Sequence, residues 1–483
     1  MRHFDYRSLG ELQSSAGELG ATHVLFEPDP ARVKSILSRP VPVGEFTLGN
    51  SIAIHPMEGC DGTLDGRPGE LTFRRYRRFA AGGAKLLWFE ATAVAAEGRA
   101  NPRQLWIHKG SLRDFARLLC ELRREHRARY GTTDDLLEPL QLTHSGRYCQ
   151  PRRLIACHSP AVDRKTGVAP DYPVISDSDL ERLEDQYVEA AKLGVAAGFR
   201  AVDIKATHGY LLSELLGAKS RPGPYGGSLE NRTSFIRNVI GKIRAALGRQ
   251  LILCMRLGVF EGVPYTRDPA TGMGVPIDYP LPYPTGFGVD PNNPLVEDLA
   301  EVRQAISWFR EWGIRLLNVS MGSPYFNPHV GRPFEKPDEG NYEEPEHPLL
   351  GVERHFRIAG ELQRTFPDLP MVGTGYSWLQ KYAINAGARN IADGNIRVFG
   401  IGRGALAYPD FARDALDTGE LDERRVCKTL TYCTYLMRRK DNEFGQWPTG
   451  CPPFDKEGYG EIMKQARATQ RAASPPPGRP EAN

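Results

Sequence analysis

One short segment of the chain, VDIKATHGYLLSELL at residues 202–216, gathers three side chains that can bind or release a proton. Lys205, His208 and Tyr210 follow directly on an apolar run, and a second apolar run begins at Leu211. An ammonium, an imidazole and a phenol are costly to bury unless they have partners. Their placement where a buried strand ends therefore marks a candidate site for proton chemistry.

Further polar side chains stand where other apolar runs end. They are His55, Glu58, Glu90, Gln141, His144, Arg256, Ser320, Thr374 and Arg403. The elements that position them are eight short apolar runs, at 51–56, 84–90, 137–144, 200–205, 251–257, 314–320, 369–375 and 396–402. Most are followed by an amphipathic stretch, and this alternation predicts a parallel sheet. We expect a closed (β/α)₈ barrel with these polar groups at its C-terminal mouth, a doubly wound sheet being the alternative.

The clearest helix patterns cover residues 111–130, 176–198 and 228–248. Ser176 and Asp179 fit a capping box, and Ser228 is the expected N-cap of the third helix. The expected organisation is a lead-in (1–49), the barrel (50–420), a C-terminal extension (421–470) and a disordered tail (471–483). Two insertions, 261–295 and 321–350, follow strands and are rich in aromatic residues, so both are expected to cover the mouth as lids.

Composition excludes several classes of function. A net charge of +3 favours neither a nucleic acid nor an anionic membrane as partner. No apolar run approaches the roughly 18 residues that span a bilayer, and the first residues lack the apolar core of a signal peptide. Eight cysteines in 483 residues do not form a disulfide scaffold. A reduced cytoplasmic setting and a small-molecule substrate are expected.

Glycine-rich turns end the last two strands. MVGTGYS (371–377) and VFGIGRGAL (398–406) stand where barrels build phosphate sites from backbone N–H groups, and Arg403 adds a permanent cation. These glycines could instead only make tight turns. Gln141 ends a buried strand and could pair with a ring imide, whereas Arg256 requires an anion or acceptors. His144 could be a satisfied core histidine or a substrate contact.

These segments resemble the old yellow enzyme family of flavin-dependent ene-reductases. The resemblance rests on IHPMEGCDG (54–62), FEATAVAAEGR (89–99), LQLTHSGR (140–147), AGFRAVDIKATHGYLLSELL (197–216) and RPGPYGGSLENRTSFI (221–236), with the late glycine pair. It runs from about residue 50 to 416 in family order. The relatives include dienoyl-thioester reductases and trimethylamine dehydrogenase.

The resemblance implies an FMN-bearing barrel that uses NAD(P)H. By position, Pro56, Met57, Glu58 and Ala91 line the flavin, Gln141 and Arg256 contact its pyrimidine edge, and Gly373, Thr374, Gly375, Gly402 and Arg403 hold its phosphate. Lys205 and His208 stand where the family places the two donors to a substrate carbonyl, and Tyr210 where it places the proton donor. Hydride would pass from the flavin to the β-carbon of an activated C=C bond. Tyr325 and His144 are the expected substrate contacts.

Three departures from the family pattern stand out. Lys205 replaces the usual histidine, and either binds an oxyanion or substrate carboxylate, or pairs with Glu58 or Glu90. Glu58 stands beside the flavin where a carboxylate disfavours the reduced form unless it is neutralised, and a Glu58–Lys205 pair would do this. Larger relatives hold an iron–sulfur centre after the barrel. Here only Cys427, Cys433 and Cys451 remain, so no cluster is expected.

Two other functions stay open on the sequence. One is an FMN-dependent dehydrogenase that oxidises an amine or a ring and passes electrons to a carrier; aromatic residues at the mouth, such as Tyr325, would favour it. The other is a flavoprotein subunit without catalysis. A homo-oligomer or an electron-transfer partner is also left open.

Overall fold

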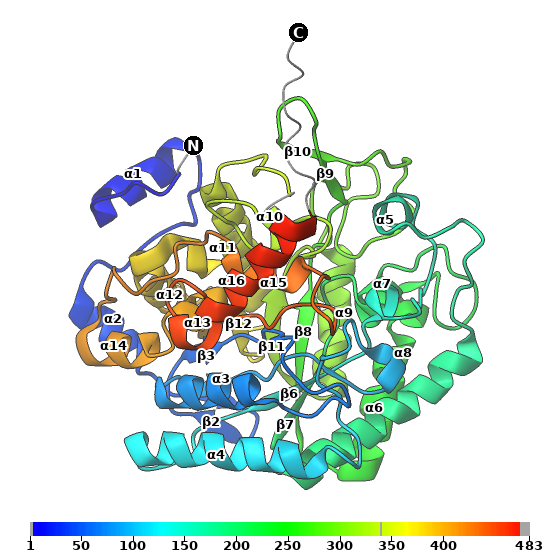
Figure 1. Ribbon diagram of the computed structural model, residues 1–483, viewed down its shortest axis with the longest axis horizontal. Coiled ribbons are helices and arrows are strands. Elements are labelled where there is room, and N and C mark those ends of the chain that lie inside the picture. The colour runs from blue at the N-terminus through cyan, green and yellow to red at the C-terminus, as the bar shows by residue number, and fades with distance from the viewer. Residues whose placement is uncertain (1–2, 339–340, 474–483) are drawn as a thin grey trace.

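The computed structural model describes residues 3–338 and 341–473, and within them eight parallel strands form a closed barrel wrapped by helices (Figure 1). The strands are β3 (Ile52–Ile54), β4 with its continuation β5 (Leu86–Leu87 and Thr92–Ala93), β6 (Pro139–Thr143), β7 (Ala201–Ile204), β8 (Ile252–Gly258), β11 (Ile314–Ser320), β12 (Met371–Gly373) and β13 (Val398–Ile401). Each overlaps an apolar run in which the sequence predicts a strand. The barrel prediction is confirmed.

The barrel closes through the segment that holds β4 and β5. This segment pairs with β3 on one side and with β6 on the other, and Leu86 bridges Leu137 between them. On the far side β13 pairs with β3. Strands of this kind are covered by helices outside and by packed side chains inside, which explains why they read as continuous apolar runs rather than alternating ones.

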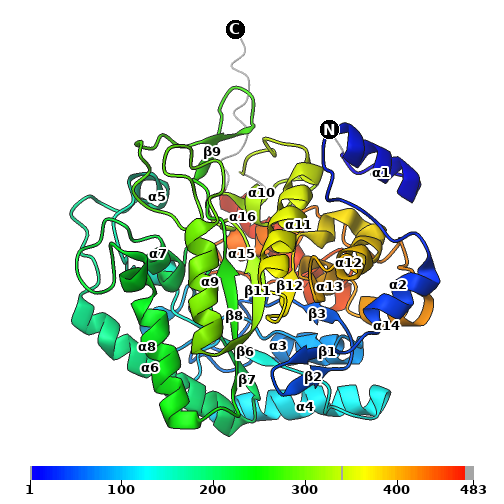
Figure 2. The ribbon, with the colours of Figure 1, turned by 180° about the vertical axis from the view of Figure 1, so that it is seen from behind.

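A hairpin closes the N-terminal end of the barrel. It consists of β1 (Val41–Val43) and β2 (Phe46–Leu48), and its apolar side chains pack into one cluster with Trp88 and Leu137 from the barrel interior. Figure 2 shows this hairpin at the end opposite the hairpin of β9 and β10. The lead-in, which also holds α1 (Leu9–Glu18) and α2 (Pro30–Leu37), is therefore a folded part of the barrel.

The main helices that follow the strands are α3 (Glu70–Ala81), α4 (Leu112–Tyr130), α6 (Asp177–Ala197), α8 (Leu229–Leu247), α9 (Ala300–Trp312), α11 (Pro348–Thr365), α12 (Ala383–Ala392) and α14 (Phe411–Thr418). Three of them, α4, α6 and α8, are the helices that the sequence predicts. Ser176 Oγ accepts a hydrogen bond from the Asp179 N–H at 3.1 Å, and Ser228 Oγ accepts one from the Asn231 N–H at 3.3 Å. Both predicted N-caps are confirmed.

The two insertions pack on each other above the C-terminal end of the barrel. The first forms the hairpin of β9 (Tyr265–Arg267) and β10 (Gly274–Pro276), and the second contains α10 (Pro328–Gly331). The backbone N–H of Tyr265 donates to the carbonyl of Phe326 at 2.7 Å. Three short helices, α5 (Pro160–Thr166), α7 (Leu211–Leu216) and α13 (Arg403–Ala407), complete this end.

The C-terminal extension folds back across the barrel as α15 (Tyr432–Arg438) and α16 (Lys456–Ala473), drawn in orange and red in Figure 1. It is held by the carboxylate of Asp455, which forms ion pairs with Arg74 and Arg78 of α3. Residues 471–473 of the predicted disordered tail end α16, and residues 474–483 lie outside the described part. None of the helices in the described ranges is long and apolar enough to cross a membrane.

Candidate active site

A pocket at the C-terminal mouth brings together nearly all of the residues expected from the sequence. The pocket encloses a cavity of about 190 Å³. The expected residues that line it are Pro56, Met57, Glu58, Ala91, Gln141, Lys205, His208, Tyr210, Arg256, Tyr325, Thr374, Gly375, Gly402 and Arg403. They come from the ends of different strands, as chemistry in this fold requires.

Two expected residues do not line the pocket. Gly373 lies within β12, where a Cβ atom would meet the side chain of Ile396 at 2.9 Å. His144 is buried, and its Nδ1 accepts a hydrogen bond from the Gly146 N–H at 3.2 Å. Burial alone lowers the pKa of His144 to about 4. The placement of His144 matches the core histidine that the sequence left as the alternative.

The floor of the pocket is organised by Asp203 of β7, a residue that sequence reasoning did not select. Its carboxylate accepts hydrogen bonds from Gln141 Nε2 at 2.6 Å, Trp88 Nε1 at 2.7 Å and the Arg256 backbone N–H at 2.7 Å. Burial lowers the pKa of Arg256 to about 10, and the charge of Asp203 opposes that shift. Asp203 therefore holds the side chain of Gln141 and the backbone of Arg256, the two residues expected at the flavin ring.

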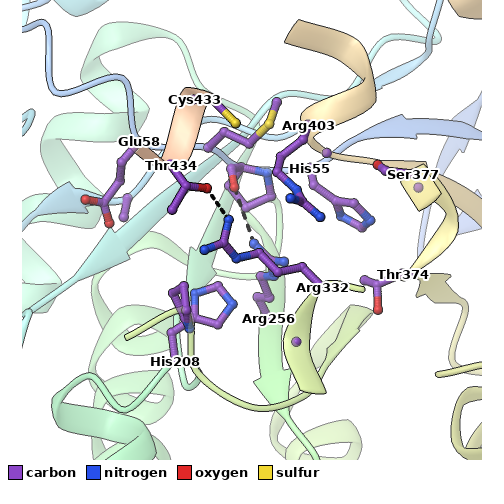
Figure 3. A pocket seen from close by; sticks show the side chains of 18 of the residues that line it. His55, Glu58, His208, Arg256, Arg332, Thr374, Ser377, Arg403, Cys433 and Thr434 are labelled. Atoms are coloured by element: carbon purple, nitrogen blue, oxygen red, sulfur yellow. Dashed lines mark hydrogen bonds between the residues drawn. The ribbon is translucent and has the colours of Figure 1, made fainter. Parts of the chain in front are cut away.

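One face of the pocket, which we call the cofactor wall, consists of His55, Arg256, Arg332 and Arg403, with Asn318 behind them. In Figure 3 the three arginine side chains converge on this face. Each of the five residues has a buried polar atom without a hydrogen-bond partner among the described residues: His55 Nε2, Arg256 Nε, Asn318 Oδ1, Arg332 Nε and Arg403 Nη1. Each buried polar atom without a hydrogen-bond partner lowers the free energy of unfolding by about 1–3 kcal/mol.

The loops after β12 and β13 complete this wall. Gly375 adopts φ +93°, and a Cβ atom there would lie 2.9 Å from the ring of His355, so the turn requires glycine. Arg403 donates to the Pro333 carbonyl at 3.1 Å. The pKa of Arg332 is lowered to about 9 by burial and then by the charge of Arg403. A bound phosphate would relieve this repulsion and supply the missing acceptors.

These observations fit FMN. Its phosphate matches Arg332 and Arg403 beside the glycine turns, and its isoalloxazine ring matches the amide of Gln141 and the cation of Arg256. The sequence predicts Arg403 for this wall but not Arg332, which lies in the second insertion.

A second group of lining residues, which we call the substrate wall, consists of Glu58, Lys205, His208, Tyr210 and Tyr325. The Tyr210 hydroxyl donates a hydrogen bond to Glu58 Oε1 at 2.9 Å, and its oxygen lies 2.8 Å from the Tyr325 hydroxyl oxygen. Lys205 Nζ lies 3.5 Å from the same Glu58 oxygen and 3.6 Å from the centre of the Tyr210 ring. The ammonium is thus held between a carboxylate and an aromatic face.

Backbone geometry aims His208 into the pocket. It adopts φ +67°, a conformation that non-glycine residues rarely take, and its carbonyl accepts a hydrogen bond from Ser323 Oγ at 3.0 Å. Its Nε2 lies 3.3 Å from Ser320 Oγ. Tyr210, two residues later, is the N-cap of α7, so the helix begins immediately after the proton donor.

Burial sets the protonation states of this wall. It lowers the pKa of Lys205 to about 8 against the opposing effect of Glu58. It lowers the pKa of His208 well below its usual value, and Arg256 and Lys205 add to the shift. It raises the pKa of Tyr210 well above the usual value, and Glu58 adds to that shift. At neutral pH Lys205 is therefore mainly charged, His208 is neutral and Tyr210 keeps its proton.

The structure decides between the two carboxylates that the sequence offers to Lys205. Glu90 accepts a hydrogen bond from the Gly59 N–H at 2.8 Å and is paired with the buried Arg75. Glu58 is the residue within reach of Lys205. The expected pair of Glu58 with Lys205 is confirmed as a contact.

The C-terminal extension supplies a part of the pocket that sequence reasoning missed. Cys433, Thr434, Met437 and Thr449 all line it. Arg332 donates to Thr434 Oγ1, as Figure 3 shows, and the Thr449 N–H donates to the Gly59 carbonyl at 2.7 Å. Cys433 belongs to the cysteine pattern noted in the sequence, but Thr434, Met437 and Thr449 belong to no periodic pattern or recognisable motif, so no sequence signal could have placed these three here.

The three late cysteines gather at a second cavity. Cys427, Cys433 and Cys451 line it together. Over the residues that the structure describes, however, no three His, Cys, Asp or Glu side chains are placed to hold a metal ion.

Comparison with known sequences agrees with this site. Residues 37–271 match the family described as NADH:flavin oxidoreductase / NADH oxidase. An NADPH dehydrogenase of Bacillus pumilus is 31% identical over 286 residues, which cover 57% of this chain and 70% of that protein. An NADPH dehydrogenase of Geobacillus sp. is 29% identical over 296 residues, or 60% of this chain and 74% of the relative.

Solved structures agree in fold. A 2-naphthoyl-CoA reductase complexed with 2-naphthoyl-CoA superposes with a TM-score of 0.65 at 16% identity, covering 89% of this chain. This chain spans 58% of that longer protein. The old yellow enzyme homologue of Zymomonas mobilis superposes with a TM-score of 0.56 at 19% identity, covering 80% of this chain and 94% of that one. The chain belongs to the NADH:flavin oxidoreductase / NADH oxidase family and is an NAD(P)H-dependent FMN oxidoreductase.

Proposed function

We propose that this oxidoreductase reduces a C=C bond activated by a neighbouring carbonyl or thioester. The observation that carries the proposal is the substrate wall, where Lys205, His208 and Tyr210 line one pocket with the residues expected to bind the flavin. When bound and reduced by the nicotinamide, FMN supplies the hydride that such a reduction needs.

Two side chains would hold the substrate oxygen. Lys205, charged at neutral pH, and His208, neutral and able to donate through one ring N–H, would both donate hydrogen bonds to it. Negative charge grows on this oxygen as hydride reaches the β-carbon. Donors fixed in a buried site stabilise such charge far better than water does.

Tyr210 would deliver the proton to the α-carbon. Its raised pKa keeps it protonated until a strongly basic enolate forms beside it. Glu58 and Tyr325 hold its hydroxyl group from two sides, which restricts the direction in which the proton can leave. We expect Glu58 to orient Tyr210 and Lys205 rather than to contact the substrate.

The same wall argues against oxidation of an amine. Tyrosine faces near the mouth would suit a cationic substrate. Lys205 already lies over the face of Tyr210, at 3.6 Å from the ring centre. A substrate ammonium would meet the lysine charge in that position, whereas a carbonyl or carboxylate would be attracted.

A two-step anaerobic mixing experiment tests the proposal. NADPH or NADH is added to the FMN-loaded protein, and bleaching of the flavin absorbance is followed. A cyclic enone or an enoyl thioester is then mixed with the reduced protein. In a separate experiment, a simple amine is mixed with the oxidised protein. Reoxidation by an enone or an enoyl thioester is expected. Failure of both to reoxidise the reduced protein, or bleaching of the oxidised protein by the amine, would refute the proposal.

A further inference from the structure

A second cavity of about 580 Å³ lies beside the active-site pocket. Its walls are the segment 427–433, the turn 451–454 and one face of α16. Small-molecule sites commonly occupy roughly 300–1,000 Å³, so the cavity has the size of a ligand site rather than of a surface that docks a protein domain.

The charged side chains among the residues that line this cavity are all positive. Arg403, Lys428, Lys456, Lys464 and Arg467 contribute to its lining, and no Asp or Glu is among the described residues that line it. Arg403 is shared with the cofactor wall, and Lys428 donates to Gln380 Oε1 at 2.9 Å, so Lys456, Lys464 and Arg467 are the cations that belong to the cavity.

The nearest acidic residues of this region are engaged elsewhere. Asp455 is paired with Arg74 and Arg78 of α3, and Glu457 with Arg74 at 3.1 Å. Glu461 does reach Lys464, at 3.2 Å, but the two side chains are 68% and 78% exposed, and such surface pairs are weak. Over the part of the chain that the structure describes, the lining of the cavity therefore keeps a net positive charge.

Much of the remaining lining is aromatic or apolar. Tyr432 and Phe454 present rings to the cavity, and Met463 lies beside them. The guanidinium of Arg467 lies 5.7 Å from the centre of the Tyr432 ring. An inorganic anion would leave this surface uncovered, whereas an aromatic base can stack on a tyrosine or an arginine plane.

We propose that this cavity binds a purine nucleotide that carries more than one phosphate. The phosphates would lie among the lysine and arginine side chains, and the base against Tyr432 and Phe454. The cavity and the active-site pocket share Arg403, Leu406 and Cys433 in their walls. A nucleotide in this position is either a free effector or the head group of a substrate whose reactive end lies over the flavin.

Calorimetric titration of the FMN-loaded protein tests the site directly. The probes are adenosine 3′,5′-bisphosphate and adenosine 2′,5′-bisphosphate, with adenosine as the uncharged probe. Saturable binding of adenosine 3′,5′-bisphosphate, weakened by added salt and absent for adenosine, is expected because the phosphates carry the interaction. Binding of the 2′,5′ isomer alone would be explained by NADPH, which contains it, and would count against the proposal. Absence of binding for both bisphosphates would overturn the proposal.

Variants locate the binding. Lys456→Gln combined with Arg467→Gln is expected to weaken bisphosphate binding at least tenfold. Arg471→Gln, on the same helix but outside the cavity lining, is expected to leave it unchanged. Should the first pair lower the unfolding temperature, Lys456→Gln with Lys464→Gln removes two exposed charges instead. Equal affinity of the folded double variant and the unmodified protein would overturn the proposal.

Two kinetic arms then separate the sources of the nucleotide. An enoyl group is presented once as a nucleotide-bearing thioester and once on a short thiol without the nucleotide. Competition by the bisphosphate against the first substrate alone identifies a substrate head group, whereas an equal effect on both identifies an effector. The titration requires no turnover, so a failure of the proposed ene-reduction would not be mistaken for a failure of this site.

Discussion

The cofactor wall and the substrate wall face the same pocket but satisfy their polar groups in opposite ways. On the cofactor wall His55, Arg256 and Arg403 each keep a buried polar atom that has no partner within residues 3–338 and 341–473. On the substrate wall the Lys205 ammonium and the Tyr210 hydroxyl both meet the carboxylate of Glu58.

The difference follows from how long each ligand stays. A resident cofactor supplies the missing partners permanently, so the protein can leave donors open for it. A substrate leaves after each turnover, and buried groups that it abandons must be satisfied by one another. The polar groups of the substrate wall therefore satisfy one another while no substrate is bound.

The largest effect should come from removing the proton donor of the substrate wall. Tyr210→Phe is expected to slow reoxidation of the reduced protein by an enone roughly 10²- to 10⁴-fold, the usual contribution of general acid catalysis. Reduction by NADPH should be unchanged, because that step does not use the tyrosine proton. Rapid-mixing absorbance measures both steps.

The control for this change is Tyr148→Phe. Tyr148 stacks on Tyr325 with ring centres 4.1 Å apart but does not line the pocket. Its loss of a hydroxyl group should leave both steps within about twofold. Comparable slowing in both variants would mean that the tyrosine stack, and not the Tyr210 proton, limits the reaction.

The next effect separates the two walls by cofactor retention. Arg256→Met removes a buried cation from the cofactor wall and is expected to weaken FMN binding about 100-fold, since hydrogen bonds to charged groups contribute roughly 1.5–3 kcal/mol each. Lys205→Met, an equally large change in charge on the substrate wall, should leave FMN bound. Flavin absorbance of the protein after dialysis measures both. Equal loss of flavin from the two variants would contradict the division into two walls.

The third effect is a shift in the midpoint potential of the flavin, and we expect it to have opposite signs when Glu58 or Lys205 loses its charge. Glu58→Gln removes a negative charge near the flavin and should raise its midpoint potential, because the reduced flavin is stabilised by nearby positive charge. Lys205→Met should lower the potential. Shifts of about 30 mV are expected, which for a two-electron couple corresponds to about 1.4 kcal/mol. Unchanged potentials in both variants would show that the pair does not tune the flavin.

The smallest effect is a pH dependence. The pKa of Lys205 is lowered to about 8, so the donor is charged below that pH and loses its proton above it. Reoxidation by an enone should slow several-fold as the pH rises through about 8. Lys205→Gln should remove this inflection and leave a flatter profile. An inflection that persists in Lys205→Gln must belong to another group.

Much of this site could be predicted because its residues stand at the ends of strands. An apolar run followed by a polar residue marks both the strand and the place where its side chain enters the mouth, as at Lys205 and Arg256. The choice between Glu58 and Glu90 for the lysine could not be made from the sequence. It depends on Arg75, which α3 brings to Glu90 and which leaves only Glu58 available.

The other residues of the site could not be predicted, because they come from segments without a periodic pattern of apolar residues. Arg332 lies in an insertion, and Thr434 and Thr449 lie in the C-terminal extension. Their positions follow from how loops pack on the finished barrel. The same holds for the hairpin of β1 and β2, whose two short strands are too brief to give a pattern but whose apolar residues fill the barrel floor.

The part of the pocket made by Thr434 and Thr449 also bears on how the holoenzyme is assembled. Both residues follow every barrel strand in the chain, so a barrel that has just folded still has an open side next to the cofactor wall. FMN would enter through that opening, and docking of residues 433–449 would then cover part of it. We therefore expect cofactor loading to precede the final folding step. The flavin-free protein should be cleaved by proteases in this segment sooner than the loaded one.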